Sequence, residues 1–323
     1  MTRYAATLIA VLLGDQLAAS RAADAPAYPQ RPIRLIAPIA PGGGVDTMAR
    51  TLGPELGARL GQNVVIDNRP GAGGSIGAEL VAKAAADGHT LMLSGSAFVL
   101  RTLLYPARYD PLADFAPITQ LVEHPYVMLL NASLPASNVK ELIALAHKDP
   151  GALSYASSGN GSLIHLSGEL FKQLARVKMT HVPYKGIAAS FPDLFAGRVH
   201  VTFSSIPTAL PHVRSARLRP IGVTSRKRAA ALAEVPTLEE SGIAGFEVTQ
   251  WYGVFAPAAA PKPVIARLQR EIVSALKSAA MSQRFAVEKA SGIGNSPAEF
   301  AANIRKEMDK WRALVAQGNI KGN

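Results

Sequence analysis

Short apolar, β-branched runs alternate with helical patterns along most of this chain, and that alternation limits its possible folds more than any other feature. The first such runs lie at 33–37, 64–66 and 90–93, with helical patterns at 46–60 and 75–86 between them. A βαβαβ order predicts a parallel sheet with helices on both faces. At 323 residues, the chain is also long enough for two domains of ordinary size.

A second alternation follows the first, and a tail of helices follows both. The strand-like runs of this part lie at 126–130, 153–156, 181–184, 199–203 and 218–224, with helical patterns beginning at 138, 162 and 187. A long β-like run at 247–255 leads to amphipathic helices at 264–279 and 297–317, which have no sheet of their own. We therefore predict two α/β lobes, each a mostly parallel sheet flanked by helices, joined by crossing strands. The expected lobes are 23–131 plus 249–323, and 132–248.

The N-terminus has the layout of a cleaved secretory signal peptide. Arg3 precedes an apolar run at 5–13, and small residues lead to a cleavage site after Ala22. The run is too short to span a bilayer. We expect residues 1–22 to be removed on export; Asp15 interrupts the pattern, so a disordered or interfacial leader is the alternative.

Cysteine content and charge exclude several classes of protein. The chain has no cysteine, which excludes disulfides, thiolate metal sites and a cysteine nucleophile. Its formal net charge of +11 suggests an acidic partner such as nucleic acid, but its Lys and Arg residues are dispersed and aromatic residues are sparse. The dense basic cluster at 214–228 is expected to be a solvated rim around a strand, with a docking patch for an acidic partner as the alternative. No nucleic-acid partner is expected.

Three glycine-rich loops, at 41–44, 71–74 and 158–161, each precede a helical pattern. Taken singly, each is explained by a tight turn or a cap. Together they expose backbone N–H groups beside positive helix ends, which favours an anion. None matches a P-loop or a dinucleotide fingerprint, so phosphate is disfavoured. We predict that a carboxylate is held between the lobes by Gly43, Gly44, Ser158, Gly161 and Ser162.

Two residues beside these loops allow other interpretations. Asp46 is placed to cap the first helix, with direct ligand contact as the lesser alternative. Residues 73–77 match G-x-S-x-G, so Ser75 is a candidate nucleophile of a secreted serine hydrolase. That motif requires a sharp strand-to-helix turn, whereas residues 67–72 separate Ser75 from its strand. Ser75 is therefore expected to be a helix N-cap instead.

The polar residues elsewhere give weaker signals. The seven histidines show no spacing typical of a metal site, so no metal and no cofactor are expected. His165, on the first turn of a helix, is either a cleft residue or a core histidine. Lys185 follows a strand and is either a partner for a second carboxylate or a solvated loop lysine.

Short motifs, in order along nearly the whole mature chain, resemble one family. They are 38–46 (PIAPGGGVD), 68–77 (NRPGAGGSIG), Tyr105 with 109–112 and 115–117, 155–161 (YASSGNG), 181–186 (HVPYKG), Pro207 with 210–211, and 235–237. Together they resemble the Bug family, the TctC-type extracytoplasmic solute-binding proteins of tripartite tricarboxylate transporters. The resemblance implies a monomeric, two-lobed periplasmic binding protein of the type II, or Venus-flytrap, class. Such a protein is not an enzyme; it closes on a small carboxylate and serves a transporter or a sensor kinase.

The resemblance also implies where the ligand binds. In the family, one ligand carboxylate is held between the loops that match 41–46 and 157–162 here, partly through ordered water. With the loop analysis, this gives a set of candidate ligand-binding residues: Ile39, Pro41, Gly42, Gly43, Gly44, Asp46, Ser94, Ser96, Ser157, Ser158, Gly159, Asn160, Gly161, Ser162, His165, Tyr184, Lys185 and Ser204.

The chain departs from the family pattern at several of the expected specificity positions. Ile39 stands where relatives commonly have Phe, and Ser204-Ser205 stands where an acid and asparagine are frequent. His200 replaces another frequent acid, and Arg101-Thr102 replaces Asn-Pro. The loss of acids and the gain of Arg101 and His200 lead us to expect a more anionic ligand than is usual.

Overall fold

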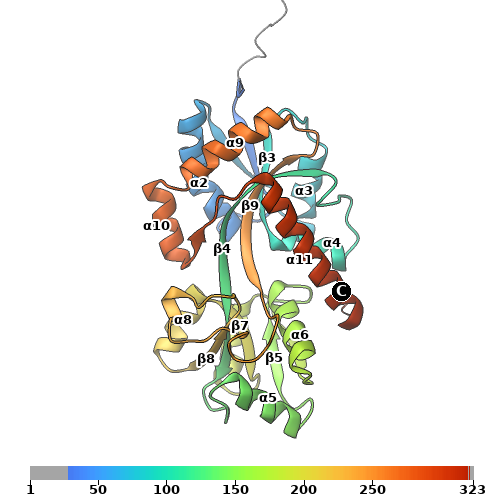
Figure 1. Cartoon of the computed structure of the whole chain (residues 1–323), viewed down its shortest axis with the longest axis vertical. Helices are drawn as coiled ribbons and strands as arrows, with labels where there is room; N and C mark the ends of the chain where they lie inside the picture. Colours follow the sequence, from blue (N-terminus) through green and yellow to red (C-terminus); the bar gives the residue numbers. More distant parts are fainter. Residues whose placement is uncertain (1–27, 319, 321–323) are drawn as a thin grey trace, which may run out of the picture.

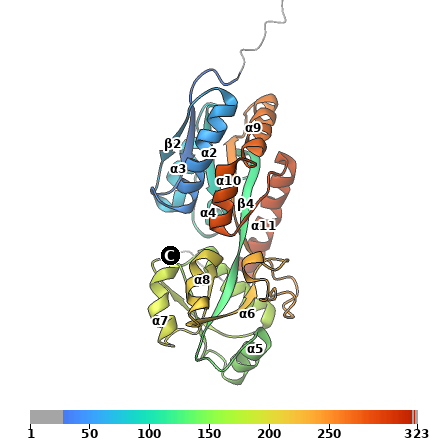
Figure 2. The same ribbon diagram turned by 90° about the vertical axis from the view of Figure 1, so that its left-hand side faces the viewer.

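The computed structural model describes residues 28–318 and residue 320 of the chain. It shows two lobes stacked along the long axis of the molecule and joined by extended strands (Figure 1). The side view shows the same division (Figure 2). This is the predicted two-lobed α/β architecture. The expected signal peptide, 1–22, lies outside the described residues. None of the helices that are described is long and apolar enough to cross a membrane.

The first lobe is built on the first alternation of the sequence. Its parallel strands are β1 (Ile33–Ala37), β2 (Val64–Asn68) and β3 (Thr90–Gly95), in the order β2-β1-β3. The helices that follow these strands are α2 (Gly44–Leu60), α3 (Ser75–Ala82) after the short η2 (Ala72–Gly74), and α4 (Ser96–Leu104). Helices on both faces explain why four of the five residues of β1 are buried.

The second lobe repeats this plan. Its parallel strands are β5 (Ser154–Ser157), β6 (Thr180–Pro183) and β7 (Val201–Ser205), while β8 (Leu218–Val223) is antiparallel to the strand that enters the lobe. The helical segments of this lobe are α5 (Val139–Lys148), α6 (Leu163–Ala175), η3 (Ile187–Ser190), α7 (Phe191–Phe195), α8 (Ile206–Arg214) and η4 (Ala230–Leu232). The predicted cap of α5 is confirmed, since the Asn138 side chain accepts a hydrogen bond from the Glu141 N–H at 3.0 Å.

Two strands connect the lobes. β4 (Phe115–Asn131) is one continuous strand of 17 residues, of which the sequence pattern predicted only 126–130. From Phe115 to Pro125 it pairs with β9 (Thr249–Pro257), and from Tyr126 onward it pairs with β7 and β8. The two sheets are therefore continuous through β4, which belongs to both.

The tail does not pack as simply as the sequence suggested. Helices α9 (Lys262–Ala275) and α10 (Ala279–Glu288) pack on α2 of the first lobe, and β10 (Ser291–Gly292) pairs with β4. Helix α11 (Pro297–Gly318) packs on α4 and on β4 but also contacts α6 of the second lobe. Its side chains divide accordingly: Phe300 and Ile304 lie in the core of the first lobe, while Trp311 and Leu314 lie in the core of the second.

Three helices were not predicted. α4 follows its strand without a loop, α8 contains two prolines that argue against a helix, and α10 begins where the helix expected at 264–279 ends. The prediction that Trp311 is a core residue is confirmed, because its side chain is fully buried. The predicted capping box before α11 is also present: Ser296 Oγ accepts from the Glu299 N–H at 3.2 Å, and Glu299 accepts from the Ser296 N–H at 2.8 Å.

Candidate functional site

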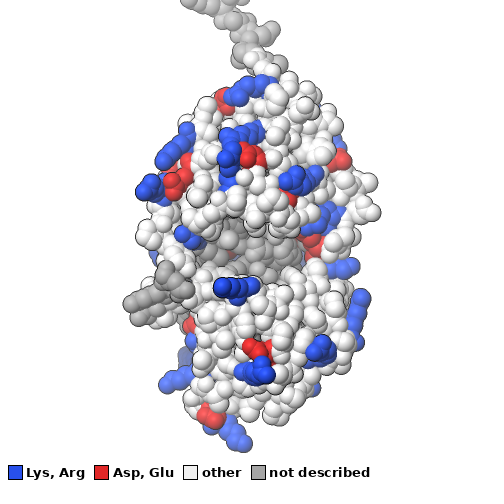
Figure 3. Space-filling model, turned by 180° about the vertical axis from the view of Figure 1, so that it is seen from behind, with Lys and Arg blue, Asp and Glu red and all other residues white. Residues whose placement is uncertain are grey.

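A cleft lies between the lobes on the face opposite α11, where a space-filling view shows a hollow (Figure 3). Two adjoining cavities, of about 380 and 350 Å³, form this cleft and share Gln250 and Tyr252 of β9. Each has the size of a small-molecule site. The lobe 1 cavity is lined by Ile39, Gly44, Ser94 and Gly73, among others, and the lobe 2 cavity by Ser158, Ser205 and Glu288, among others.

The first glycine loop presents the N-terminus of α2 to the cleft. Gly43 is the N-cap, and Gly44 and Val45 line the lobe 1 cavity. Helix geometry leaves the first N–H groups of α2, those of Gly44, Val45 and Asp46, without an acceptor inside the helix. These are the donors that an anion in the cleft would meet. Gly42 is not among them, because its N–H donates to Asp46 Oδ2 at 2.8 Å.

Asp46 holds this loop in place and does not cap the helix as predicted. It lies inside the first turn of α2, and its side chain is only 2% exposed. Besides the Gly42 N–H, it accepts from Arg50 Nε at 3.0 Å and from Asn68 Nδ2 at 2.9 Å. The hydrogen bond from Arg50, together with those from Gly42 and Asn68, lowers the pKa of Asp46 to about 2. A charged carboxylate whose oxygens are already bonded braces the loop, and Asp46 is not among the residues that line the two cavities.

Tyr252 closes the space around the α2 N-terminus. A Cβ atom added at Gly44 would overlap the Tyr252 hydroxyl. Gly44 is therefore required for the close approach of this hydroxyl to the backbone, which is one reason for the glycine run. A Cβ added at Gly43 would meet only the movable end of the Ile39 side chain.

The glycine loop of the second lobe, at 157–162, is braced by two histidines. Ser157 Oγ accepts from the Gly159 N–H at 3.1 Å and hydrogen-bonds to His181 Nε2 at 2.7 Å. The Gly161 N–H donates to His165 Nδ1 at 3.0 Å. Two backbone donors that the sequence assigned to the ligand are thus used inside the loop.

The residues on either side of these glycines have different roles. Ser162 Oγ caps α6 by accepting from the His165 N–H at 3.1 Å. Ser158 lines the lobe 2 cavity.

His165 and His181 stack on each other behind this loop. Their ring centroids lie 3.9 Å apart with an angle of 8° between the planes. Burial lowers the pKa of His165, and burial together with His165 lowers that of His181 to about 4. Both rings are therefore neutral at neutral pH. His165 is 7% exposed and supports the loop from behind, so the core-histidine alternative fits the structure.

Other candidate residues lie outside the two cavities. Ser205, one residue later than predicted, lines the lobe 2 cavity, while Ser204 is fully buried and pairs with Val127 in a core cluster. Ser96 is fully buried at the start of α4. Tyr184 donates to Asp193 at 2.7 Å, and Lys185 is exposed in a bend. Pro41, Asn160 and the remaining loop candidates are not among the residues that line the two cavities.

The two residues that suggested a more anionic ligand do not line the cleft. Arg101 donates from Nε to Ser75 Oγ at 2.7 Å and stacks over the Tyr105 ring. His200 precedes β7, at the end opposite Ser205, and its Nδ1 accepts from the Ser154 N–H at 3.0 Å. Neither side chain is among the residues that line the described cavities. The structure thus removes the reason for expecting a more anionic ligand.

The hydrolase interpretation of Ser75 is wrong. Ser75 is the first residue of α3, and its N-cap is Gly74, so it is not a cap either. Its hydroxyl accepts a hydrogen bond from the Arg101 guanidinium, a group that stays protonated in proteins and cannot act as a general base. Ser75 connects the glycine-rich loop at 71–74 to α4.

Sequence reasoning missed most of the residues at the floor of the cleft. These are His124, Tyr126, Pro207, Gln250, Tyr252 and Glu288. Gln250 and Tyr252 carried a usable signal, because residues two apart on a crossing strand face the same side. Their neighbours Thr249 and Trp251 face the other side, toward α11. Glu288 had no such signal, since its helix was not predicted.

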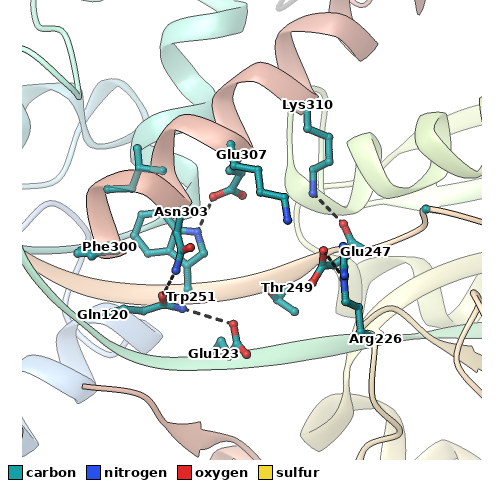
Figure 4. Close-up of a pocket in the computed structure, with 13 residues that line it drawn as sticks. Gln120, Glu123, Arg226, Glu247, Thr249, Trp251, Phe300, Asn303, Glu307 and Lys310 are labelled. Atoms are coloured by element: carbon teal, nitrogen blue, oxygen red, sulfur yellow. Dashed lines mark hydrogen bonds and ion pairs between the residues drawn. The ribbon is translucent and has the colours of Figure 1, made fainter. Parts of the chain in front are cut away.

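A third cavity, of about 370 Å³, lies on that other side, between α11 and the crossing strands (Figure 4). Glu307 of α11 accepts from Trp251 Nε1 at 2.6 Å and from Trp311 Nε1 at 3.2 Å. Burial raises the pKa of Glu307. Lys310 donates to the Glu247 carbonyl at 2.7 Å. These bonds fasten α11 to the strand that joins the lobes.

The described residues contain no group of His, Asp and Glu side chains that could hold a metal ion. On the face shown in Figure 3, Lys and Arg are scattered among Asp and Glu. The site therefore offers backbone N–H groups, hydroxyls and aromatic surface to a small molecule.

Comparison with known proteins agrees with this geometry. The sequence profile of TctC, described as the tripartite tricarboxylate transporter family receptor, matches residues 48–320. The chain belongs to the TctC family. BugT of Bordetella pertussis is 36% identical over 324 residues, covering 99% of each chain. As a member of a receptor family, the protein is a solute-binding protein and not an enzyme.

Solved structures share the fold. Rpa4515 of R. palustris, solved with adipate, is 34% identical, with a TM-score of 0.76 over 91% of this chain and 99% of its own. MatC of Rhodopseudomonas palustris, solved with malate, is 31% identical, with a TM-score of 0.73 over 89% of this chain and 100% of its own. Both of these relatives were solved with a small dicarboxylate bound.

Proposed function

We propose that this TctC protein captures a small carboxylate between its lobes and delivers it to the membrane subunits of a tripartite transporter. The observation that carries the proposal is the α2 N-terminus, whose first N–H groups face the cleft from one lobe while the loop at 157–162 faces it from the other. No Lys or Arg is among the described residues that line either cleft cavity. Binding therefore relies on backbone dipoles and hydroxyls, which suit a single carboxylate. Adipate and malate in two relatives support this ligand class.

Closure follows from dividing the donors between lobes. In the open form, only the donors of one lobe reach the ligand carboxylate, so half of its hydrogen bonds are missing. Burying a carboxylate without those hydrogen bonds would cost several kcal/mol. The ligand therefore shifts the population toward the closed form. We place the hinge where β4 changes partners, at Pro125–Tyr126, and where β9 begins, at Val248–Thr249. The first of these lies a few residues before the expected boundary at 131.

The proposed location is the periplasm, and the proposed working form is a monomer. The leader-like pattern at 1–22 and membership of a transporter receptor family support export. A sensor kinase would read the same closed form.

The test is calorimetric titration of the purified protein with adipate, malate and the diamide of adipate. We expect binding of a carboxylate and none of the diamide. In Gly44→Ala, the new Cβ displaces the Tyr252 hydroxyl, and affinity should fall by more than about tenfold. Gly61→Ala, in the left-handed cap at the far end of α2, is the matched control for a general effect on the helix. Undiminished binding by Gly44→Ala would show that the carboxylate binds elsewhere.

A further inference from the structure

One edge of the cleft holds a polar cluster that the loops do not explain. It consists of His124 on β4, Tyr252 on β9, and Arg284 and Glu288 on α10. Arg284 and Glu288 form an ion pair, and the rings of His124 and Tyr252 meet edge to face at 5.5 Å. His124 and Glu288 line the lobe 2 cavity together with Ser158.

Several buried polar atoms of this cluster have no hydrogen-bond partner. They are His124 Nδ1, Arg284 Nε and Glu288 Oε2, which make up half of the unpartnered buried side-chain atoms among the described residues. Native proteins pair nearly all such atoms. His124 is buried, with 9% of its surface exposed, and it lines the cavity. Two of the three residues, His124 and Glu288, line the cavity, while Arg284 lies behind them in its ion pair with Glu288. Unpaired groups on two residues that line a cavity indicate that a bound molecule completes them.

The cluster lies across Tyr252 from the carboxylate donors. The Tyr252 hydroxyl abuts Gly44 at the α2 N-terminus, while its ring contacts His124. Helix α10 contacts α2 on one side and α8, across the cleft, on the other. A ligand whose carboxylate sits at the α2 N-terminus thus extends toward Glu288.

The charges of the cluster cancel. Arg284 and Glu288 neutralise each other, and burial beside Arg284 lowers the pKa of His124 to about 4, which leaves its ring uncharged at neutral pH. Glu288 is the only Asp, Glu, Lys or Arg among the described residues lining this cavity. A second carboxylate here would face Glu288 without a free cation, and an ammonium group would face Arg284.

We propose that this cluster is a second recognition site in the cleft, which binds an uncharged hydroxyl or carboxamide group at the far end of the carboxylate ligand. Such a group donates to Glu288 Oε2 and accepts from His124, the two cluster residues with unpaired atoms that line the cavity. The inference rests on the proposed function, because it presupposes that a carboxylate is held at the α2 N-terminus. It separates this protein from the relative solved with the dicarboxylate adipate.

The experiment is calorimetric titration at neutral pH with hexanoate, its ω-hydroxy and ω-amino derivatives, and adipate. Butyrate, its ω-hydroxy and ω-amino derivatives, and succinate provide the same comparison at a shorter length. In the series, six-carbon or four-carbon, whose members bind more tightly, the hydroxy acid should bind about tenfold more tightly than both the unsubstituted acid and the diacid.

Variants locate the effect. Arg284→Met combined with Glu288→Leu removes both charges without leaving one unpaired, so the preference for the hydroxy acid should disappear while the unsubstituted acid still binds. His124→Phe should weaken the preference and keeps the ring. Asp309→Leu combined with Arg312→Met, at an exposed ion pair on α11, is the control and should retain the preference.

The outcomes are distinct. Binding of the diacid as tight as that of the hydroxy acid, or no gain from the hydroxyl over the unsubstituted acid, overturns this inference and leaves the proposed function standing. Failure of every acid in both series to bind overturns the proposed function and this inference with it.

Discussion

The two glycine loops of the cleft occupy equivalent places in the two lobes but are braced by opposite chemistry. In the first, a buried carboxylate, Asp46, holds the Gly42 N–H and is itself held by Arg50 and Asn68. In the second, neutral imidazoles hold the loop through Ser157 and the Gly161 N–H. The same local requirement, a fixed loop before a helix, is thus met once by a charged carboxylate and once by neutral imidazoles.

This difference teaches that the glycines supply the shape of the loop but not its rigidity. The N–H groups of Gly42, Gly159 and Gly161 already donate hydrogen bonds within their own loops. Only the other N–H groups of the loops remain for a ligand. Since each lobe contributes half of the site, losing either brace should weaken binding, but by unequal amounts and under different conditions.

The largest effect is expected from Asp46→Asn. The change removes the ion pair with Arg50 and the charge that orders Gly42 and Asn68, so the free energy of unfolding should fall by about 2 kcal/mol or more. Thermal denaturation and calorimetry should show lower stability and ligand affinity reduced more than about tenfold. Unchanged affinity would mean that the first loop needs no brace.

An intermediate effect is expected from His165→Phe. The phenyl ring preserves the stack on His181 but leaves the Gly161 N–H without its acceptor, which should cost about 1 kcal/mol, or about fivefold in affinity. His147→Phe, at an exposed histidine on α5, is the control. If both variants bind as the parent does, the histidine does not order the second loop.

The smallest effect concerns the dependence of stability on pH, which should differ between the two braces. The folded-state pKa of His181 is lowered to about 4, so the unfolded chain binds more protons between pH 6.5 and 4, and stability should fall as pH falls through that window. Partial exposure of the ring limits this loss to about 1 kcal/mol. The pKa of Asp46 is lowered to about 2, so its contribution is present above about pH 4 and is lost only below that value.

Thermal melts from pH 7 to 4.5 test this prediction. His181→Asn keeps a polar partner for Ser157 but does not titrate, and its melting temperature should depend less on pH than that of the parent. His124, His165 and His200, whose pKa values burial also lowers, contribute the slope that remains. Equal slopes for parent and variant would contradict the assignment to His181.

The sequence predicted the features that arise locally. The strands β1 and β8, the caps at Asn138 and Ser296 and the two-lobed order all follow from periodicity and capping patterns within short windows. The role of each loop residue could not be predicted from such windows. Whether a backbone N–H is free for a ligand or bonded inside the protein depends on a side chain elsewhere in the chain. The Gly161 N–H, for example, donates its hydrogen bond to His165, which lies in the first turn of α6.

The polar cluster at Glu288 could not be predicted for a related reason. Its members come from β4, β9 and α10, which are far apart in the chain and meet only because β4 and β9 pair and α10 folds back on α2. Ser204 illustrates a smaller difficulty, because a shift of one residue along a strand moves a side chain to the other face.

Helix α11 has a consequence for what can enter the cleft. Phe300 is anchored in one core and Trp311 in the other, and Glu307 ties the stretch between them to Trp251. Any opening movement must pivot close to this helix, on the far side of the molecule from the entrance. The width of the cleft entrance then depends on how far α11 allows the two lobes to tilt apart. The width of a molecule therefore decides whether it can enter the cleft, before it forms any hydrogen bond there.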